Sequence, residues 1–129
     1  MNALKINETD TTPAIRFDYS TGRLEIVGYH SMPEVSMKFY QPVISWVNEY
    51  IKKPVSRSTT VVFKLVYFNS SSNKCFVEIF KKLDALAVKG HPVYLKWYYE
   101  EDDEDMYRLA EEIETFLDHL QIEKIPFND

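Results

Sequence analysis

The amino-acid sequence predicts an α/β fold in which short strands alternate with amphipathic helices. Two apolar segments rich in β-branched and aromatic residues, 59–68 and 92–100, flank a segment whose apolar residues recur at helical spacing. Such a strand–helix–strand unit implies a parallel pair of strands with a right-handed crossover. The whole order is strand–strand–helix–strand–helix–strand–helix with a candidate final strand, which predicts a sheet of four to five strands.

The N-terminal part is expected to form a hairpin followed by a helix. Apolar residues recur at helical spacing over 30–53, and Ser31 with Glu34 three residues later has the pattern of a capping box. Pro42 lies inside this helix and is expected to kink it or split it in two. The two preceding strands, joined by a Ser-Thr-Gly turn, are expected over 14–19 and 23–29.

The C-terminal part supplies the remaining elements. The second helix has an apolar stripe, carries its charged residues, Asp84 among them, mostly on the opposite face, and stops at Gly90. The last helix is expected over 102–120, because its acidic first turn suits the positive end of the helix dipole. The tail, 121–129, is a candidate edge strand.

One face of the sheet is expected to be only partly covered. Lys64 and Lys96 occupy alternate positions within the two central strands, where an apolar side chain would be needed on a covered face. A small-molecule binder using this face is therefore one function that the sequence leaves open.

Composition excludes several classes of function. The 129 residues fit a single domain over 1–129, in which residues 1–12 are a loose polar lead-in. A net charge of −5 argues against a nucleic-acid partner, and no apolar run approaches the about 18 residues that a membrane span needs. Only three glycines are present, which excludes long glycine-rich cofactor loops, and the lone Cys75 fits a reducing, cytoplasmic compartment.

Neither a metal site nor an enzyme is indicated. His30, His91 and His119 stand alone, without the spacing of a metal motif. Ser71 and Lys74 form an S-x-x-K pattern, but the other elements of the enzymes that use it are missing. We therefore expect no catalytic residue, no cofactor and no metal.

An acidic segment precedes the last helix. It lacks the alternating ligands and the central glycine of a calcium-binding loop, so a solvated, dipole-matched helix start is the favoured interpretation. A docking surface for a partner protein stays open as the alternative function. The segment consists of Glu100, Glu101, Asp102, Asp103, Glu104 and Asp105.

The stretch "YFNSSSNKC", residues 67–75, lies at the seam between a strand and a helix. Asn69, Ser70 or Ser71 can accept a hydrogen bond from the free N–H groups of the first helical turn. Alternatively, one hydroxyl accepts a phosphate, which a helix N-terminus favours and which adds about two negative charges for a partner to sense. On the residues alone, the cap is the favoured interpretation.

Four stretches of the sequence together resemble the SiaC family of bacterial regulatory phosphoproteins: "TPAIRFDYSTGRLEIVGYHSMPE", "FYQPVISWVNEY", "LVYFNSSSNKC" and "WYYEEDDEDM". The resemblance extends over nearly the whole chain. It implies a fold similar to STAS domains, the fold of anti-sigma-factor antagonists, with a mixed sheet flanked by helices. It also implies a non-enzymatic protein in which a serine or threonine is phosphorylated by a kinase and dephosphorylated by a PP2C-type phosphatase.

The resemblance further implies that the unphosphorylated form binds and activates a diguanylate cyclase, in cyclic-di-GMP and biofilm regulation. A sigma-factor regulator is the other partner class. The Asn-Thr-Ser-Ser run of the family places the phosphoacceptor at Ser70, although the neighbouring serines leave this ambiguous by one or two positions. The glycine that follows the acceptor in anti-sigma-factor antagonists is absent here. The expected switch loop consists of Asn69, Ser71, Ser72, Asn73 and Lys74 around Ser70.

Overall fold

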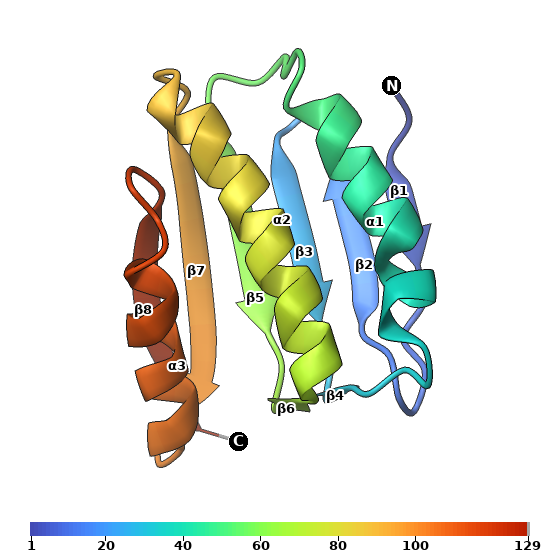
Figure 1. Ribbon diagram of the computed structural model, residues 1–129, viewed down its shortest axis with the longest axis vertical. Coiled ribbons are helices and arrows are strands. Elements are labelled where there is room, and N and C mark those ends of the chain that lie inside the picture. The colour runs from blue at the N-terminus through green and yellow to red at the C-terminus, as the bar shows by residue number, and fades with distance from the viewer. Residues whose placement is uncertain (129) are drawn as a thin grey trace.

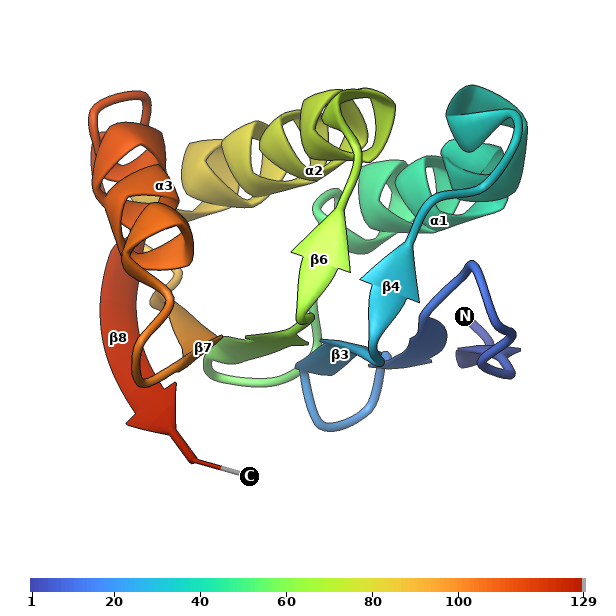
Figure 2. The same ribbon diagram turned by 90° about the horizontal axis from the view of Figure 1, so that it is seen from below.

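The computed structural model, described for residues 1–128, is a mixed sheet that carries three helices on one face (Figures 1 and 2). The strands of the large sheet are β1 (Leu4–Ile6), β2 (Ala14–Asp18), β3 (Arg23–Val27), β5 (Thr59–Lys64), β7 (Val93–Glu100) and β8 (Gln121–Phe127). A small sheet pairs β4 (His30–Ser31) with β6 (Tyr67–Phe68). The helices are α1 (Ser36–Tyr50), α2 (Ser70–Val88) and α3 (Glu104–Glu114).

The topology confirms the predicted α/β class and its parallel strand–helix–strand unit. The order in the large sheet is β1-β2-β3-β5-β7-β8, antiparallel from β1 to β3 and parallel from β3 to β8. Gly22, with a φ of 72°, closes the predicted hairpin, as a left-handed turn position requires. Within residues 1–128, no helix combines the length and the apolar character needed to cross a membrane.

The large sheet has six strands rather than four or five, because the N-terminal segment is not all loose. Leu4 pairs with Phe17 of β2, and Leu4 and Ile6 pack half-buried against the core while Lys5 between them is exposed. Three alternating residues are too short a pattern to stand out in a polar stretch. The prediction of a loose lead-in over residues 1–12 was therefore wrong for β1.

The expected strand over 59–68 is divided in two. The chain leaves the large sheet after Lys64, and the N–H groups of Val66 and Tyr67 both donate to the carbonyl oxygen of Tyr29 at 3.0 Å. Figure 2 shows β4 and β6 rising side by side from the sheet toward the helix layer. This step carries the chain from the end of β5 to the start of α2.

The first helix begins later than the capping-box pattern suggested. Ser31 lies in β4, and α1 has Val35 at its N-cap with no side-chain cap bond. Pro42 does not split the helix, which runs without a break past it. The proline lies on the exposed side of α1, so the Lys38 carbonyl that loses its helical N–H partner lies on the solvent-facing side.

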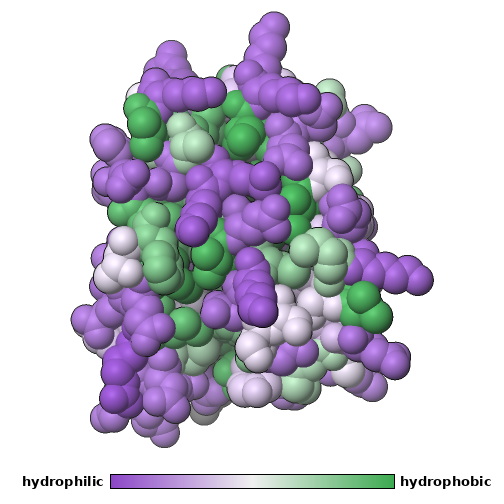
Figure 3. All heavy atoms as spheres, viewed as in Figure 1, coloured by the Kyte–Doolittle hydropathy of each residue, from purple (hydrophilic) through white to green (hydrophobic). Residues whose placement is uncertain are grey.

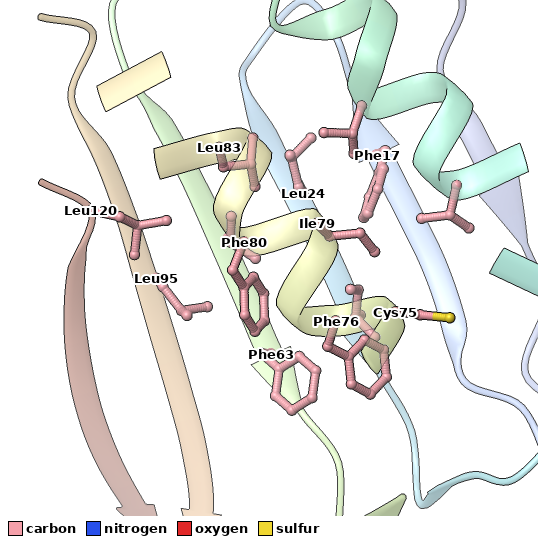
Figure 4. Packing of buried hydrophobic residues seen from close by; sticks show 14 of the residues in the cluster. Phe17, Leu24, Phe63, Cys75, Phe76, Ile79, Phe80, Leu83, Leu95 and Leu120 are labelled. Carbon is pink, nitrogen blue, oxygen red and sulfur yellow. The ribbon is translucent and has the colours of Figure 1, made fainter. Parts of the chain in front are cut away.

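The core lies between the three helices and the sheet, and Phe63 of β5 lies in it beside Phe76 and Phe80 of α2 (Figure 4). Its ring stacks on Trp97 of β7, with centroids 4.5 Å apart and planes at 11°. The predicted apolar stripe of α2 is buried above this pair. Three further rings meet the edge of Phe63 at 4.9–5.8 Å: Phe68, Phe76 and Phe80.

The last helix is shorter than expected, and Asp84 anchors the turn that follows it. Helix α3 ends at Glu114, and the chain then turns through residues 115–120 into β8. Asp84 is buried on α2, where its carboxylate accepts three backbone N–H bonds of 2.7–3.0 Å from residues 118–120. The expectation that Asp84 faces solvent was wrong, because these N–H groups need an acceptor.

The helices lie on one side of the sheet only, which confirms the predicted partly covered face. Lys64 and Lys96 are half-buried on the other face. The ammonium group of Lys64 lies 4.4 Å from the centroid of the Phe127 ring, a cation–π contact within this face. On the side of the molecule that carries the helices, mostly hydrophilic side chains form the surface, with smaller apolar areas between them (Figure 3).

Candidate functional site

The seam between β6 and α2 is capped by Asn69 rather than by a serine. The Asn69 backbone is extended, and its side-chain oxygen accepts a 2.8 Å hydrogen bond from the N–H of Ser72. The Asn69 carbonyl then accepts the N–H of Asn73 at 3.0 Å. The serine hydroxyls are therefore not needed to start the helix.

The three serines occupy different environments. Ser70 and Ser71 are exposed, and among residues 1–128 their hydroxyls have no hydrogen-bond partner. Ser72 is 0% exposed, and its hydroxyl donates to the carbonyl oxygen of Ser31 at 2.9 Å. A modifying enzyme can therefore reach Ser70 or Ser71 in the folded protein but not Ser72.

Buried hydroxyls beneath the serines link three elements. The Ser72 hydroxyl lies 3.0 Å from that of Ser31 in β4 and 3.5 Å from that of Ser36 at the start of α1. Ser31 also bonds the hydroxyl of Tyr40, which is fully buried. Burial raises the pKa of Tyr40 and outweighs the opposing effect of its bond to Ser31, so the phenol stays neutral. This network fixes the starts of α1 and α2 to β4.

The sequence pattern did not reveal this network. Ser31 was interpreted as a helix cap, and Ser36 and Tyr40 were not singled out. Of the predicted switch loop, Asn73 is half-buried and its side-chain oxygen has no partner within residues 1–128. Lys74 is exposed one turn into α2 and forms no ion pair in the described part of the chain.

Two helix N-termini meet at this site. Helices α1 and α2 run side by side in the same direction, and both start at the end of the sheet where β4 and β6 lie (Figure 1). Among residues 1–128, the N–H groups of Ser70 and Ser71 have no acceptor, nor do those of residues 36–38. The site therefore has positive partial charge from two helix dipoles.

The acidic segment lies at the same end of the molecule, where β7 ends and α3 begins (Figure 2). The Asp103 side chain accepts the N–H of Met106 at 3.0 Å, and Arg108 contacts Asp105 at 3.2 Å. This confirms the interpretation of the segment as a helix start. In the part of the chain that the structure describes, no three metal-ligating side chains come together.

Replacing the cap should loosen the site without changing the fold. Asn69→Ala removes the acceptor for the Ser72 N–H and is expected to lower the free energy of unfolding by about 1 kcal/mol. Ser71→Ala is the matched control, expected to change it by less than about 0.5 kcal/mol because its hydroxyl has no partner. Urea unfolding measures both variants, and equal effects would contradict the assignment of Asn69 as the cap.

Comparison with known proteins identifies the family of the chain. A model of the SiaC family of regulatory phosphoproteins matches residues 6–127. The chain belongs to the SiaC family. It is 37% identical over 112 residues to an uncharacterized protein of Pseudomonas aeruginosa strain UCBPP-PA14, with 87% of each chain covered.

SiaC-family crystal structures share the fold. Apo-SiaC from Pseudomonas aeruginosa has a TM-score of 0.83 at 34% identity, over 95% of this chain and 99% of that chain. SiaC bound as activator to the diguanylate cyclase SiaD, also from Pseudomonas aeruginosa, has a TM-score of 0.83 at 33% identity, over 94% of this chain and 98% of that chain. The seam before α2 is thus set in a SiaC-family fold.

Proposed function

We propose that this SiaC-family protein is a non-enzymatic signalling switch whose phosphoacceptor is Ser70. The observation that carries the proposal is the division of roles at the seam. Asn69 caps the helix, Ser72 is buried, and the Ser70 hydroxyl is exposed and unbonded within residues 1–128. The first two positions of the helix are therefore free for modification, and the resemblance to the family's Asn-Thr-Ser-Ser run favours Ser70 over Ser71.

A phosphate on Ser70 would be stabilised locally. It adds about two negative charges at the start of α2, where the unbonded N–H groups and the helix dipole favour an anion. Lys74, four residues on and exposed, can pair with it. Because the cap belongs to Asn69, phosphorylation changes the charge of the surface without requiring the domain to refold.

We infer that the unphosphorylated form binds and activates a diguanylate cyclase in the cytoplasm. Support comes from the relative that is bound to SiaD as its activator. A kinase and a PP2C-type phosphatase would set the state of Ser70, in line with the family's description as regulatory phosphoproteins and with the resemblance set out in the sequence analysis. The protein itself would contribute a binding surface and no chemistry.

The test combines phosphate mapping with binding. Incubation with the host's kinase should phosphorylate wild type and Ser71→Ala but not Ser70→Ala. Ser70→Asp should bind the host's diguanylate cyclase at least about tenfold more weakly, a cost of about 1.4 kcal/mol, while Ser70→Ala binds like wild type. Ser45→Asp, on the exposed side of α1, makes the same charge change elsewhere as a control. Phosphate on Ser71, or unchanged binding by Ser70→Asp, would contradict the proposal.

Docking through the acidic segment predicts another outcome. Asp103 caps α3, so Glu101→Lys and Asp102→Lys reverse the charge of the segment without removing the cap. If these variants abolish cyclase binding while Ser70→Asp has no effect, the acidic segment is the docking surface and the serines have no switching role.

A further inference from the structure

We propose that four exposed apolar side chains beside Ser70 form the docking surface for a partner segment that presents carboxylates next to aliphatic side chains. We call this surface the apolar rim, and it consists of Tyr29, Val35, Met37 and Tyr67. Its location follows from the structure alone, whereas its control by phosphate rests on the proposed function of Ser70.

The members of the apolar rim are unusually exposed for their size. Each is more than half exposed, from 52% for Met37 to 65% for Tyr29. Eight large apolar side chains within residues 1–128 are more than half exposed, and four of them belong to the segments that meet at this one end of the molecule. Clustered apolar exposure of this kind marks interaction sites, whereas scattered exposed residues need no explanation.

Backbone contacts hold the rim together. Tyr67 pairs with His30 across the small sheet, and the N–H of Tyr67 donates to the carbonyl oxygen of Tyr29, so Tyr29, in the bend just before β4, lies beside β6. Val35 and Met37 flank Ser36, whose hydroxyl lies 3.5 Å from that of Ser72 in the first turn of α2. The rim is therefore set on the fixed ends of β4, β6 and α1.

Charge defines the chemistry of the partner. The protein has a net charge of −5, yet the rim lies beside two uncapped or partly capped helix N-termini and the exposed Lys38 and Lys74. Neither lysine has an ion-pair partner among residues 1–128. Glu34 is the one carboxylate in the 29–38 and 67–74 segments, and Glu8 also reaches the rim, where it accepts the N–H of Tyr29 at 3.0 Å. A partner with carboxylates beside its apolar residues matches both properties.

The acidic segment at the start of α3 orients such a partner. It lies at the same end of the molecule, so the carboxylates of the partner are repelled from that side and directed toward α1 and α2. A phosphate on Ser70 would place negative charge at the rim and oppose the same carboxylates. Phosphorylation would then weaken docking by charge alone.

Site-specific photocrosslinking in the native host tests the surface. We expect p-benzoylphenylalanine at Met37 or at Tyr67 to capture the same partner, and the captured peptide to contain Asp or Glu among Leu, Ile and Val. Val55 and Val88, equally exposed at the opposite end of the molecule, are the control positions and should capture nothing. Capture at the controls alone, capture nowhere, a basic captured peptide, or a second copy of this chain would overturn the proposal.

Charge reversal with the captured partner, purified, completes the test. The double variant Lys38→Glu, Lys74→Glu should bind it at least about tenfold more weakly, whereas Lys53→Glu, Lys89→Glu, with the same charge change at the opposite end, should stay within about twofold. Capture that persists in Ser70→Asp would overturn the phosphoswitch and leave the docking surface standing. Loss of partner binding in Ser70→Asp without capture at the rim would overturn the docking surface and leave the phosphoswitch standing.

Discussion

Phe63→Ala is expected to lower the free energy of unfolding by about 3–5 kcal/mol, the largest effect of any single change considered. Phe63 is fully buried, stacks on Trp97 and meets three other rings, so its removal leaves a cavity in the middle of the core. Typical domains are stable by about 5–15 kcal/mol, so the variant approaches the limit of folding. Urea unfolding followed by circular dichroism measures the loss.

Two further measurements sharpen this prediction. Phe63→Leu keeps most of the side-chain volume. It is expected to lower the free energy of unfolding by about half as much as Phe63→Ala, because the cavity is smaller. Tyr94→Ala changes an exposed aromatic residue of the adjacent strand and should cost less than about 1 kcal/mol. If Phe63→Ala cost no more than Tyr94→Ala, the aromatic cluster would not be the centre of the core.

Asp84→Ala is expected to lower the free energy of unfolding by about 3–4 kcal/mol. The substitution leaves the N–H groups of residues 118–120 without their acceptor, and hydrogen bonds to a charged group contribute more than neutral ones. The loss of local stability should be greatest at the turn between α3 and β8, where amide hydrogen exchange should accelerate most. Glu78→Ala on the same helix removes only a partly exposed carboxylate 4.0 Å from Lys82 and is the matched control.

The contribution of Asp84 should also depend on pH. Burial opposes its charge, but the three backbone N–H bonds outweigh burial and lower the pKa of Asp84 below its ordinary value of 3.8. The stabilisation is therefore present above the unfolded pKa and is lost as pH falls through the lower folded pKa. The stability difference between wild type and Asp84→Asn should be largest near neutral pH and shrink below about pH 4. A difference that grows in acid would contradict this role.

The sequence predicted most of the fold because its strongest signals are periodic. The apolar run before the serines and the stripe along α2 identify the central strand and the helix above it. The pattern cannot show that the run breaks after Lys64, because Leu65 to Phe68 have the same apolar character on either side of the step. Strand β1 was missed because Leu4 and Ile6 become apolar contacts only once β2 is beside them.

At the junction before α2, sequence reasoning predicted the start of a helix but not which residue caps it. Asn69, Ser70 and Ser71 were equally plausible caps from their types, and only the backbone geometry assigns the cap to Asn69. The burial of Ser72 depends on Ser31, which is 41 residues away in the chain. Long-range contacts of that kind leave no local pattern, which is also why Asp84 was expected at the surface.

The cap formed by Asn69 also bears on how fast the proposed phosphorylation of Ser70 would occur. Ser70 occupies the first position of a helix, so a kinase that binds its substrate as an extended chain must first unwind that turn. Two bonds resist the unwinding, from the Ser72 N–H to Asn69 and from the Ser72 hydroxyl to Ser31. Fraying of a helix end is a low-energy event compared with global unfolding. The strength of this one turn would then set the rate at which Ser70 is phosphorylated, separately from the affinity of the kinase for the folded surface.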